Sequence, residues 1–194
     1  MDAVKAQAQT ITAGAPARPA GETVTLPGGV SAEEFKLAFR NHPAGVAVIT
    51  ADAGRGPAGL TATSVFSVSA EPPLLVFSLS SISSSTPTIA AADTVVVHLL
   101  GADQRDAAQR FATSGIDRFA DRSTWDRLPT GEPYLVDAPS RLRGRVIERL
   151  SAGGSTVVVM HVLDVHVDPD ADHAPLVYHN RTWHRLGAAS TLAD

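Results

Sequence analysis

Hydroxyl side chains are concentrated between Gly59 and Thr86. Residues 60–69 alternate in polarity, which predicts a single β-strand with Thr61 and Thr63 on one face and Ser64 on the other. A second strand is expected from Leu74 to Leu79, followed by serines as far as Thr86. Proline suits the first helical position, so we expect a helix from Pro87 with Thr86 as its cap. Hydroxyls beside a helix N-terminus suit an anionic phosphate, and a flexible serine-rich loop is the alternative.

Other kinds of site chemistry have weaker support. The chain has no G-x-S-x-G motif for a nucleophilic serine, and it has no cysteine for thiolate or disulfide chemistry. His161 and His166 lie five apart on one predicted strand, so they should face opposite sides and cannot bind one metal together unless the strand has a β-bulge. The histidines nearer the C-terminus have no carboxylate at ligand spacing. We therefore expect no metal site.

Two further patterns resemble phosphate-binding motifs. Residues 54–59 spell G-x-G-x-x-G after a predicted strand, but a strand and not a helix is expected to follow, which indicates a hairpin turn. Arg141, Arg143 and Arg145 alternate along another strand. They could contact a dinucleotide phosphate or form a solvated outer face, and the sequence leaves both readings open.

The elements that position these residues are mostly strands. Strands are expected at 45–51, 94–100 and 156–167, with a closing pair at 175–178 and 182–186. A capping box at Ser31–Glu34 starts a helix whose apolar face, with Phe35 and Phe39, is expected in the core. A second helix should be capped by Asp103 and end at Gly115, before a polar surface excursion at 116–133. Short strands without βαβ alternation predict a mainly β fold with short helices and a β-barrel.

Size and composition set the remaining bounds. The 194 residues predict one domain at 31–187, a disordered N-terminal arm at 1–30 and a C-terminal tail at 188–194. The net charge of -4 argues against nucleic-acid binding. No stretch resembles a membrane span or a secretory signal, so we expect a cytoplasmic protein without membrane contact.

Several motifs in order along the chain resemble the flavin reductase-like family, the NAD(P)H:flavin oxidoreductases that serve two-component monooxygenases. They are HPAGVAVITA, GLTATSVFSVSAEPPLLVFSLSSISSSTPTI, VVVHLL, RFA, DRFA, LPTGEPYL after Trp125, and PLVYHNRTWHRL. The resemblance covers about residues 31–186. It implies an FMN-binding split β-barrel that forms a homodimer, with the flavin near the subunit interface. It also implies hydride transfer from NADH or NADPH to FMN or FAD, and delivery of reduced flavin to a partner monooxygenase.

The resemblance also assigns residues to the site. The isoalloxazine and ribityl chain would be lined by Thr61, Ala62, Thr63 and Ser64, and the flavin phosphate would be held by Ser78, Ser83, Ser84 and Thr86. Phe111 and Arg118 would lie beside the flavin or its adenylate, although Phe111 also fits a helix core position. The nicotinamide side would be formed by Ser155, Tyr178, His179 and Arg181. The flavin itself performs the redox chemistry, so no catalytic acid or base is expected.

The turn at Gly153-Gly154-Ser155 departs from the family pattern. Members usually have Gly-Asp-His there, and that histidine is associated with the nicotinamide side. Its absence keeps open a second hypothesis, a flavin-binding carrier or electron-transfer protein with little direct nicotinamide activity. A third hypothesis is a split-barrel module for another planar cofactor such as haem.

Overall fold

The computed structural model describes residues 28–168 and 173–192, and it shows a mainly β chain with a few short helices. The predicted disordered arm lies outside the described residues except for its last three. The helices are α1 (Ala32–Arg40), α2 (Thr86–Ala91) and α3 (Arg105–Ala112), with 3-10 turns η1 (Ala102–Gln104) and η2 (Ala188–Ser190). The strands are β1 (Ala44–Gly45), β2 (Ala47–Asp52), β3 (Pro57–Ala62), β4 (Phe66–Ser69), β5 (Leu74–Ser80), β6 (Thr94–Leu99), β7 (Trp125–Arg127), β8 (Pro133–Leu135), β9 (Ser140–Ala152), β10 (Ser155–Val167), β11 (Leu176–His179) and β12 (Thr182–Arg185).

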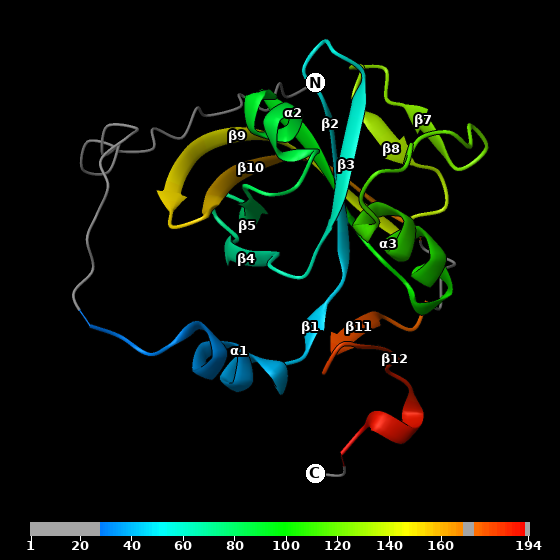
Figure 1. Ribbon diagram of the computed structural model, residues 1–194. Helices are drawn as coiled ribbons and strands as arrows, with labels where there is room; N and C mark the ends of the chain where they lie inside the picture. Colours follow the sequence, from blue (N-terminus) through cyan, green and yellow to red (C-terminus); the bar gives the residue numbers. More distant parts are fainter. Residues whose placement is uncertain (1–27, 169–172, 193–194) are drawn as a thin grey trace.

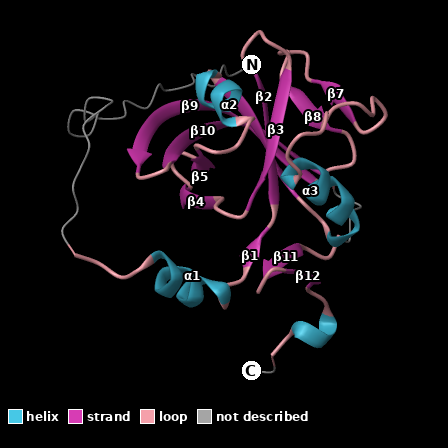
Figure 2. Cartoon of the chain, in the orientation of Figure 1, coloured by secondary structure: helices cyan, strands magenta, loops and turns pink. Residues whose placement is uncertain are grey.

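The main sheet is antiparallel, with seven strands in the order β3-β2-β6-β9-β10-β5-β4. Its two edge strands, β3 and β4, are consecutive in the chain and are joined only by residues 63–65. Such a link reaches at most about 14 Å, whereas a flat sheet would separate its edges by about 29 Å. The sheet is therefore strongly curved, with its edges brought toward one another without pairing, as Figures 1 and 2 show.

The curvature explains why one predicted strand is two. Alternation continues through residues 60–69, but β3 pairs with β2 and β4 pairs with β5, so the chain must leave one edge and join the other at Thr63–Val65. The Ser64 hydroxyl stabilises this crossing, since it accepts a hydrogen bond from Ser78 N at 3.1 Å and donates to Ser78 O at 3.4 Å.

Two helix caps differ from the prediction. Helix α2 begins at Thr86, and its N-cap residue is Ser85. The Thr86 hydroxyl does not cap the helix, because it donates to the carbonyl of Ser80 at 2.6 Å. Helix α3 begins at Arg105 and ends at Ala112 with Thr113 as its C-cap, before the predicted stop at Gly115. Asp103 lies in the preceding 3-10 turn, where its Oδ2 is 3.1 Å from His173 Nδ1.

The described residues form two apolar core clusters. One lies within the curved main sheet and includes Phe77, Val97 and Met160. The other joins α3 to the excursion after it, with Phe119 packed edge-on against both Phe111 (5.2 Å between ring centroids) and Trp125 (5.0 Å). The excursion at 116–133 was predicted to be a polar surface segment. The buried Phe119 and Trp125 show that it contributes to the core.

A buried histidine connects the sheet to β8. His98 is fully buried, its Nδ1 lies 2.9 Å from Val48 O, and its Nε2 accepts a hydrogen bond from Leu135 N at 3.1 Å. Burial lowers the pKa of the imidazole from 6.5 to about 4. The ring is therefore neutral at pH 7, with the proton on Nδ1.

Two of the three alternating arginines on β9, Arg141 and Arg143, have partners within the protein, and the third is exposed. Arg143 forms an ion pair with the buried Glu132 (Nη2 to Oε1, 2.7 Å). Burial acts to raise the pKa of Glu132, but hydrogen bonds from Arg143, Thr130 and Thr94 outweigh it and lower the pKa to about 2. The Arg141 guanidinium lies 4.5 Å above the Tyr134 ring, and Arg145 is exposed. Two of the three arginines thus stabilise the fold.

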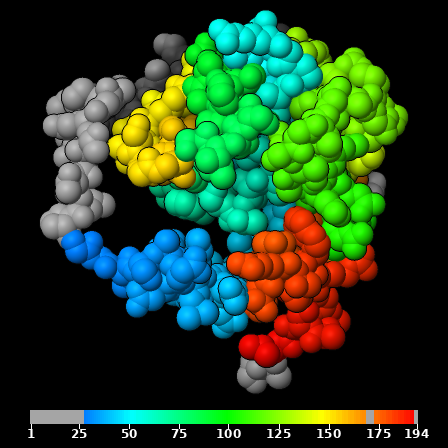
Figure 3. Space-filling model, viewed as in Figure 1, coloured from blue at the N-terminus to red at the C-terminus, as the bar shows by residue number. Residues whose placement is uncertain are grey.

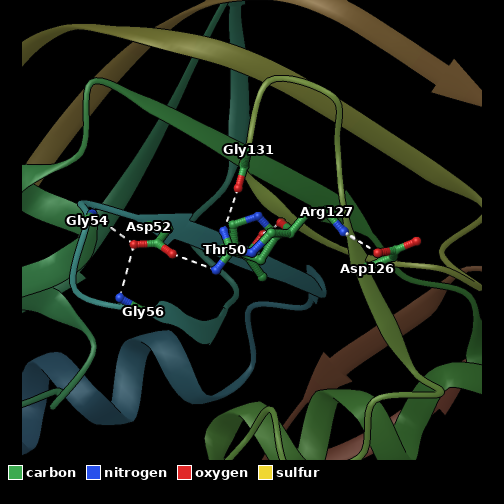
Figure 4. Close-up of polar contacts among 8 residues, drawn as sticks. Thr50, Asp52, Gly54, Gly56, Asp126, Arg127 and Gly131 are labelled. Atoms are coloured by element: carbon green, nitrogen blue, oxygen red, sulfur yellow. Dashed lines mark hydrogen bonds and ion pairs between the residues drawn. The ribbon is translucent and has the colours of Figure 1, made fainter.

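The G-x-G-x-x-G sequence forms the β2–β3 hairpin, which confirms that it is not a dinucleotide fingerprint. Figure 4 shows Asp52 Oδ1 accepting hydrogen bonds from Gly54 N (2.8 Å) and Gly56 N (3.1 Å), while its Oδ2 pairs with Arg127 at 2.7 Å. The loop amides are therefore satisfied by a side chain of the same loop. The ion pair also fastens the hairpin to β7.

Helix α1 has the predicted capping box, in which Ser31 Oγ accepts from Glu34 N and Glu34 Oε2 accepts from Ser31 N. Its predicted burial is wrong for the isolated chain. Phe35 and Phe39 are 55% and 56% exposed. Helix α1 leads directly into β1 of the small sheet β1-β11-β12, and it therefore lies apart from the main sheet (Figure 1).

Candidate functional site

A groove of about 800 Å³ lies between α1 and the rest of the molecule, and Figure 3 shows it as a hollow beside the blue helix. Four segments meet there: α1, the link from α1 into β1, the crossing between β3 and β4, and the β11–β12 hairpin. The lining residues are Phe35, Lys36, Phe39, Arg40, His42, Pro43, Ala44, Gly45, Thr63, Ser64, Val65, Phe66, Tyr178, Asn180 and Arg181. The groove thus combines aromatic walls, hydroxyls and cations, and its lining residues within the described part of the chain include no carboxylate.

The predicted TATS segment contributes two of its four residues to this groove. Thr63 is exposed and Ser64 half-buried, and both line it. The Thr61 hydroxyl instead donates to Ala108 O at 2.6 Å, and Ala62 is buried in the core. The first half of the segment therefore attaches β3 to α3, and the second half faces the groove.

The predicted phosphate residues follow β5 away from that crossing. Ser78 contacts Ser64 through its backbone, and the chain then continues through Ser80 to the serine loop at 81–85. Among the described residues the hydroxyls of Ser83 and Ser84 have no hydrogen-bond partner, so they are available to an anion. The Thr86 hydroxyl already donates to Ser80 O.

Phe111 and Arg118 do not line the groove. Phe111 is 1% exposed and belongs to the core, as its alternative interpretation predicted. Arg118 is buried, and its guanidinium donates to Thr113 O, to Gly59 O (3.1 Å) and to Ser85 Oγ (2.5 Å). Ser85 Oγ in turn donates to Gly59 O at 2.7 Å. Arg118 and Ser85 therefore fix the serine loop to β3 from inside the protein.

The predicted nicotinamide-side residues separate into three places. Tyr178 and Arg181 line the groove, with the Tyr178 ring 4.7 Å from that of Trp183. His179 lies beside Asn41, with Nε2 3.0 Å from its Oδ1. Ser155 pairs with Ser80 across β5 and β10, next to the bond from Ser81 N to Gly154 O (3.0 Å). The turn that departs from the family pattern therefore adjoins the serine loop.

Residues 28–168 and 173–192 contain no group of three or more potential metal ligands. His161 and His166 were predicted to face opposite sides of β10. An irregularity between Val162 and Asp164 instead aligns them with Arg145 and Arg141, which puts both on one side. They remain far apart along the strand. No helix in the same described parts of the chain is long and apolar enough to cross a membrane.

Sequence reasoning missed the contribution of α1 to the groove. Phe39 and Arg40 line it, and the Phe39 ring meets His42 edge-on at 5.9 Å. The motif beginning at His42 was the available signal, since it places that residue directly after the helix. The apolar spacing in α1 is equally typical of a core helix, so the pattern did not distinguish the two.

Comparison with known proteins gives consistent matches. A family profile described as "Flavin reductase like domain" matches residues 39–187. An NADH:FMN oxidoreductase of Rhodococcus erythropolis is 46% identical over 165 residues, which cover 84% of this chain and 86% of the relative. The reductase component of a 4-nitrophenol 4-monooxygenase/4-nitrocatechol 2-monooxygenase from Rhodococcus opacus is 30% identical over 131 residues, covering 68% and 70%. The solved structure of a flavin reductase domain protein from Arthrobacter sp. FB24 is 39% identical with a TM-score of 0.75, covering 80% of this chain and 95% of that one.

Proposed function

This chain belongs to the flavin reductase-like domain family, and from that premise we propose that it is an NAD(P)H:flavin oxidoreductase. It takes hydride from NADH or NADPH and transfers it to FMN or FAD. The observation that carries this proposal is the 46% identity, over most of both chains, to a protein named NADH:FMN oxidoreductase. That similarity favours a reductase over a flavin carrier and over a haem-binding module.

The groove fits a planar, anionic ligand. Its aromatic and apolar walls can cover a ring system, and its volume falls in the range of small-molecule pockets, about 300–1,000 Å³. The described lining residues include cations and no carboxylate, which favours ligands that bear phosphate. Flavin and nicotinamide dinucleotide both have this chemistry.

The residues of this chain bind and orient the two ligands. Thr63 and Ser64 would contact the isoalloxazine, while Thr61 and Ala62 hold that segment against α3 and the core. Ser83 and Ser84 would bind the flavin phosphate, assisted by Ser78 and Thr86 on the same path. Arg118 keeps the loop in place through Ser85 and Gly59, and Phe111 packs against the same Gly59 from the core.

On the donor side, Tyr178 and Arg181 line the groove and would contact the nicotinamide dinucleotide. His179 holds the end of α1, and Ser155 lies beside the serine loop. When bound, the flavin supplies the ring atom N5 that accepts hydride, so no side chain has to act as acid or base. The protein must instead keep donor and acceptor close and aligned.

The proposal extends to assembly and partner. We propose a split β-barrel that functions as a homodimer, on the basis of the curved sheet and the exposed apolar side chains of β4 and β10. Relatives that are reductase components of monooxygenases support delivery of reduced flavin to such a partner. The expected cytoplasmic location stays a prediction.

The test is the loss of absorbance at 340 nm when purified protein is mixed with NADH or NADPH, with FMN or FAD added in turn. Oxidation that requires both protein and flavin is the expected result, and it identifies the preferred pair. Flavin bound tightly, as measured by fluorescence quenching, without turnover with either donor would refute the reductase and support the carrier.

A further inference from the structure

The β11–β12 turn contains a residue that the turn itself does not favour. Asn180 and Arg181 connect the two strands with φ angles of 47° and 63°. Two-residue hairpin turns with positive φ at both positions prefer asparagine followed by glycine, because a β-carbon at the second position is strained. Arginine at position 181 is therefore unfavourable for the local backbone. Strain of this kind is typical of functional sites, which suggests that the side chain of Arg181 has a role in binding.

The turn is attached to the last turn of α1. Asn180 N donates to Arg40 O at 3.2 Å, and His179 Nε2 lies 3.0 Å from Asn41 Oδ1. Figure 1 shows the end of α1 leading into β1 beside β11. The hydrogen bonds hold Arg40 and Arg181 on neighbouring segments, and both line the groove.

Both arginines lack a partner for their charge. Within the part of the chain that the structure describes, neither guanidinium has a hydrogen bond or ion pair. A third cation of the lining, Lys36, pairs with Glu33 (3.0 Å), and both side chains of that pair are exposed. Guanidinium groups match phosphate oxygens in shape and charge, so two of them at one groove fit a ligand with more than one phosphate.

We propose that Arg40 and Arg181 form the binding site for the diphosphate of the nicotinamide donor. This inference rests on the proposed function. The proposed function assigns the flavin phosphate to Ser83 and Ser84, which do not line the groove. The phosphates that Arg40 and Arg181 bind are therefore those of the nicotinamide dinucleotide. Phe39 and Tyr178 on the adjoining walls offer rings to the bases of that ligand.

The test compares Arg181→Gly and Arg40→Gln with Arg185→Gln, an exposed arginine of β12 that does not line the groove. We expect each of the first two to raise the KM for NADH and the Kd for NAD+ by roughly tenfold, as the loss of a charged hydrogen bond does. The Kd for FMN, measured by fluorescence quenching without NADH, should stay within about twofold. Arg181→Gly should not melt below the wild type, since glycine suits the turn.

Each outcome decides the question. Unchanged KM and NAD+ affinity in both variants, with an active wild type, would overturn this inference and leave the reductase intact. Weaker FMN binding with unchanged NADH kinetics would assign the arginines to the flavin phosphate instead. If the wild type does not oxidise NADH, calorimetric titration with NAD+ still measures whether the two arginines bind the dinucleotide. Binding that both variants weaken supports the site, and no binding to the wild type refutes it.

Discussion

Among single residues, Thr63 and Ser84 are the most direct test of the flavin site, because each has an exposed hydroxyl and neither is needed by the core. Thr63→Leu and Ser84→Leu should each weaken FMN binding roughly tenfold or more, since a hydrogen bond is lost and the ligand's space is filled. Fluorescence titration measures this change. Ser114→Leu, at an exposed position outside the site, is the matched control. An unchanged FMN affinity in both site variants would refute the proposed cradle.

His98 makes the stability of the protein depend on pH. Its pKa in the folded protein, about 4, lies below the ordinary 6.5, because burial disfavours the charged ring. Above pH 6.5 the ring is neutral in both the folded and the unfolded protein, and the free energy of unfolding has its full value. As the pH falls from 6.5 toward 4, the unfolded chain binds a proton that the folded chain does not. About 3 kcal/mol of stability should be lost in that window. Urea denaturation at pH 7 and pH 4.5 measures the difference.

The matched variant for this effect is His98→Gln, whose amide can donate to Val48 O and accept from Leu135 N without titrating. Its free energy of unfolding should fall less between the two pH values than that of the wild type. Protonation of Glu132 contributes little to this difference. Its pKa is lowered from 4.5 to about 2, so the protein loses the stability that Glu132 provides only below about pH 4.5. Equal losses in both proteins would show that His98 is not the cause.

Among elements, the packing of α3 on β3 depends on the absence of a side chain at Gly59. A β-carbon there would lie 2.5 Å from Phe111 Cε1 and 3.2 Å from Ile49 O. Gly59→Ala should therefore displace α3 and cost about 1–3 kcal/mol, a fall of roughly 2–4 °C in Tm for each kcal/mol. Gly187→Ala is the control, because nothing lies within 4 Å of its added β-carbon and its φ is negative. A Gly59→Ala protein as stable as this control would contradict the packing argument.

The elements also show which parts of the fold could be predicted. The strand predicted at 94–100, the long strand predicted at 156–167 and the capping box of α1 follow from patterns within each segment, and the structure has all three. The break at Thr63–Val65 depends on the curvature of a seven-stranded sheet, so local alternation concealed it. The burial of Arg118 depends on Gly59 and Ser85, which are distant in sequence. For α1, amphipathicity predicted a helix but not what its apolar face contacts.

At the scale of the whole molecule, apolar side chains are left uncovered on one region of the main sheet. Phe66 and Val68 of β4 are 59% and 53% exposed, and Val165 of β10 is 53% exposed. An apolar groove of about 470 Å³ adjoins them, lined among others by Phe66, Leu142 and Val165. Exposed patches of this kind mark interaction surfaces, and we expect a second copy of the chain to cover this one.

Light scattering during gel filtration tests the dimer. Wild-type protein should have about twice the chain mass of 20.2 kDa. Val165→Glu should elute as a monomer, because the interface would have to bury an unpaired carboxylate. Ile116→Glu introduces the same charge at a position 48% exposed, on the excursion after α3, and should leave the mass unchanged. A wild-type monomer at micromolar concentration, or a dimer that persists in Val165→Glu, would show that this surface is not the subunit interface.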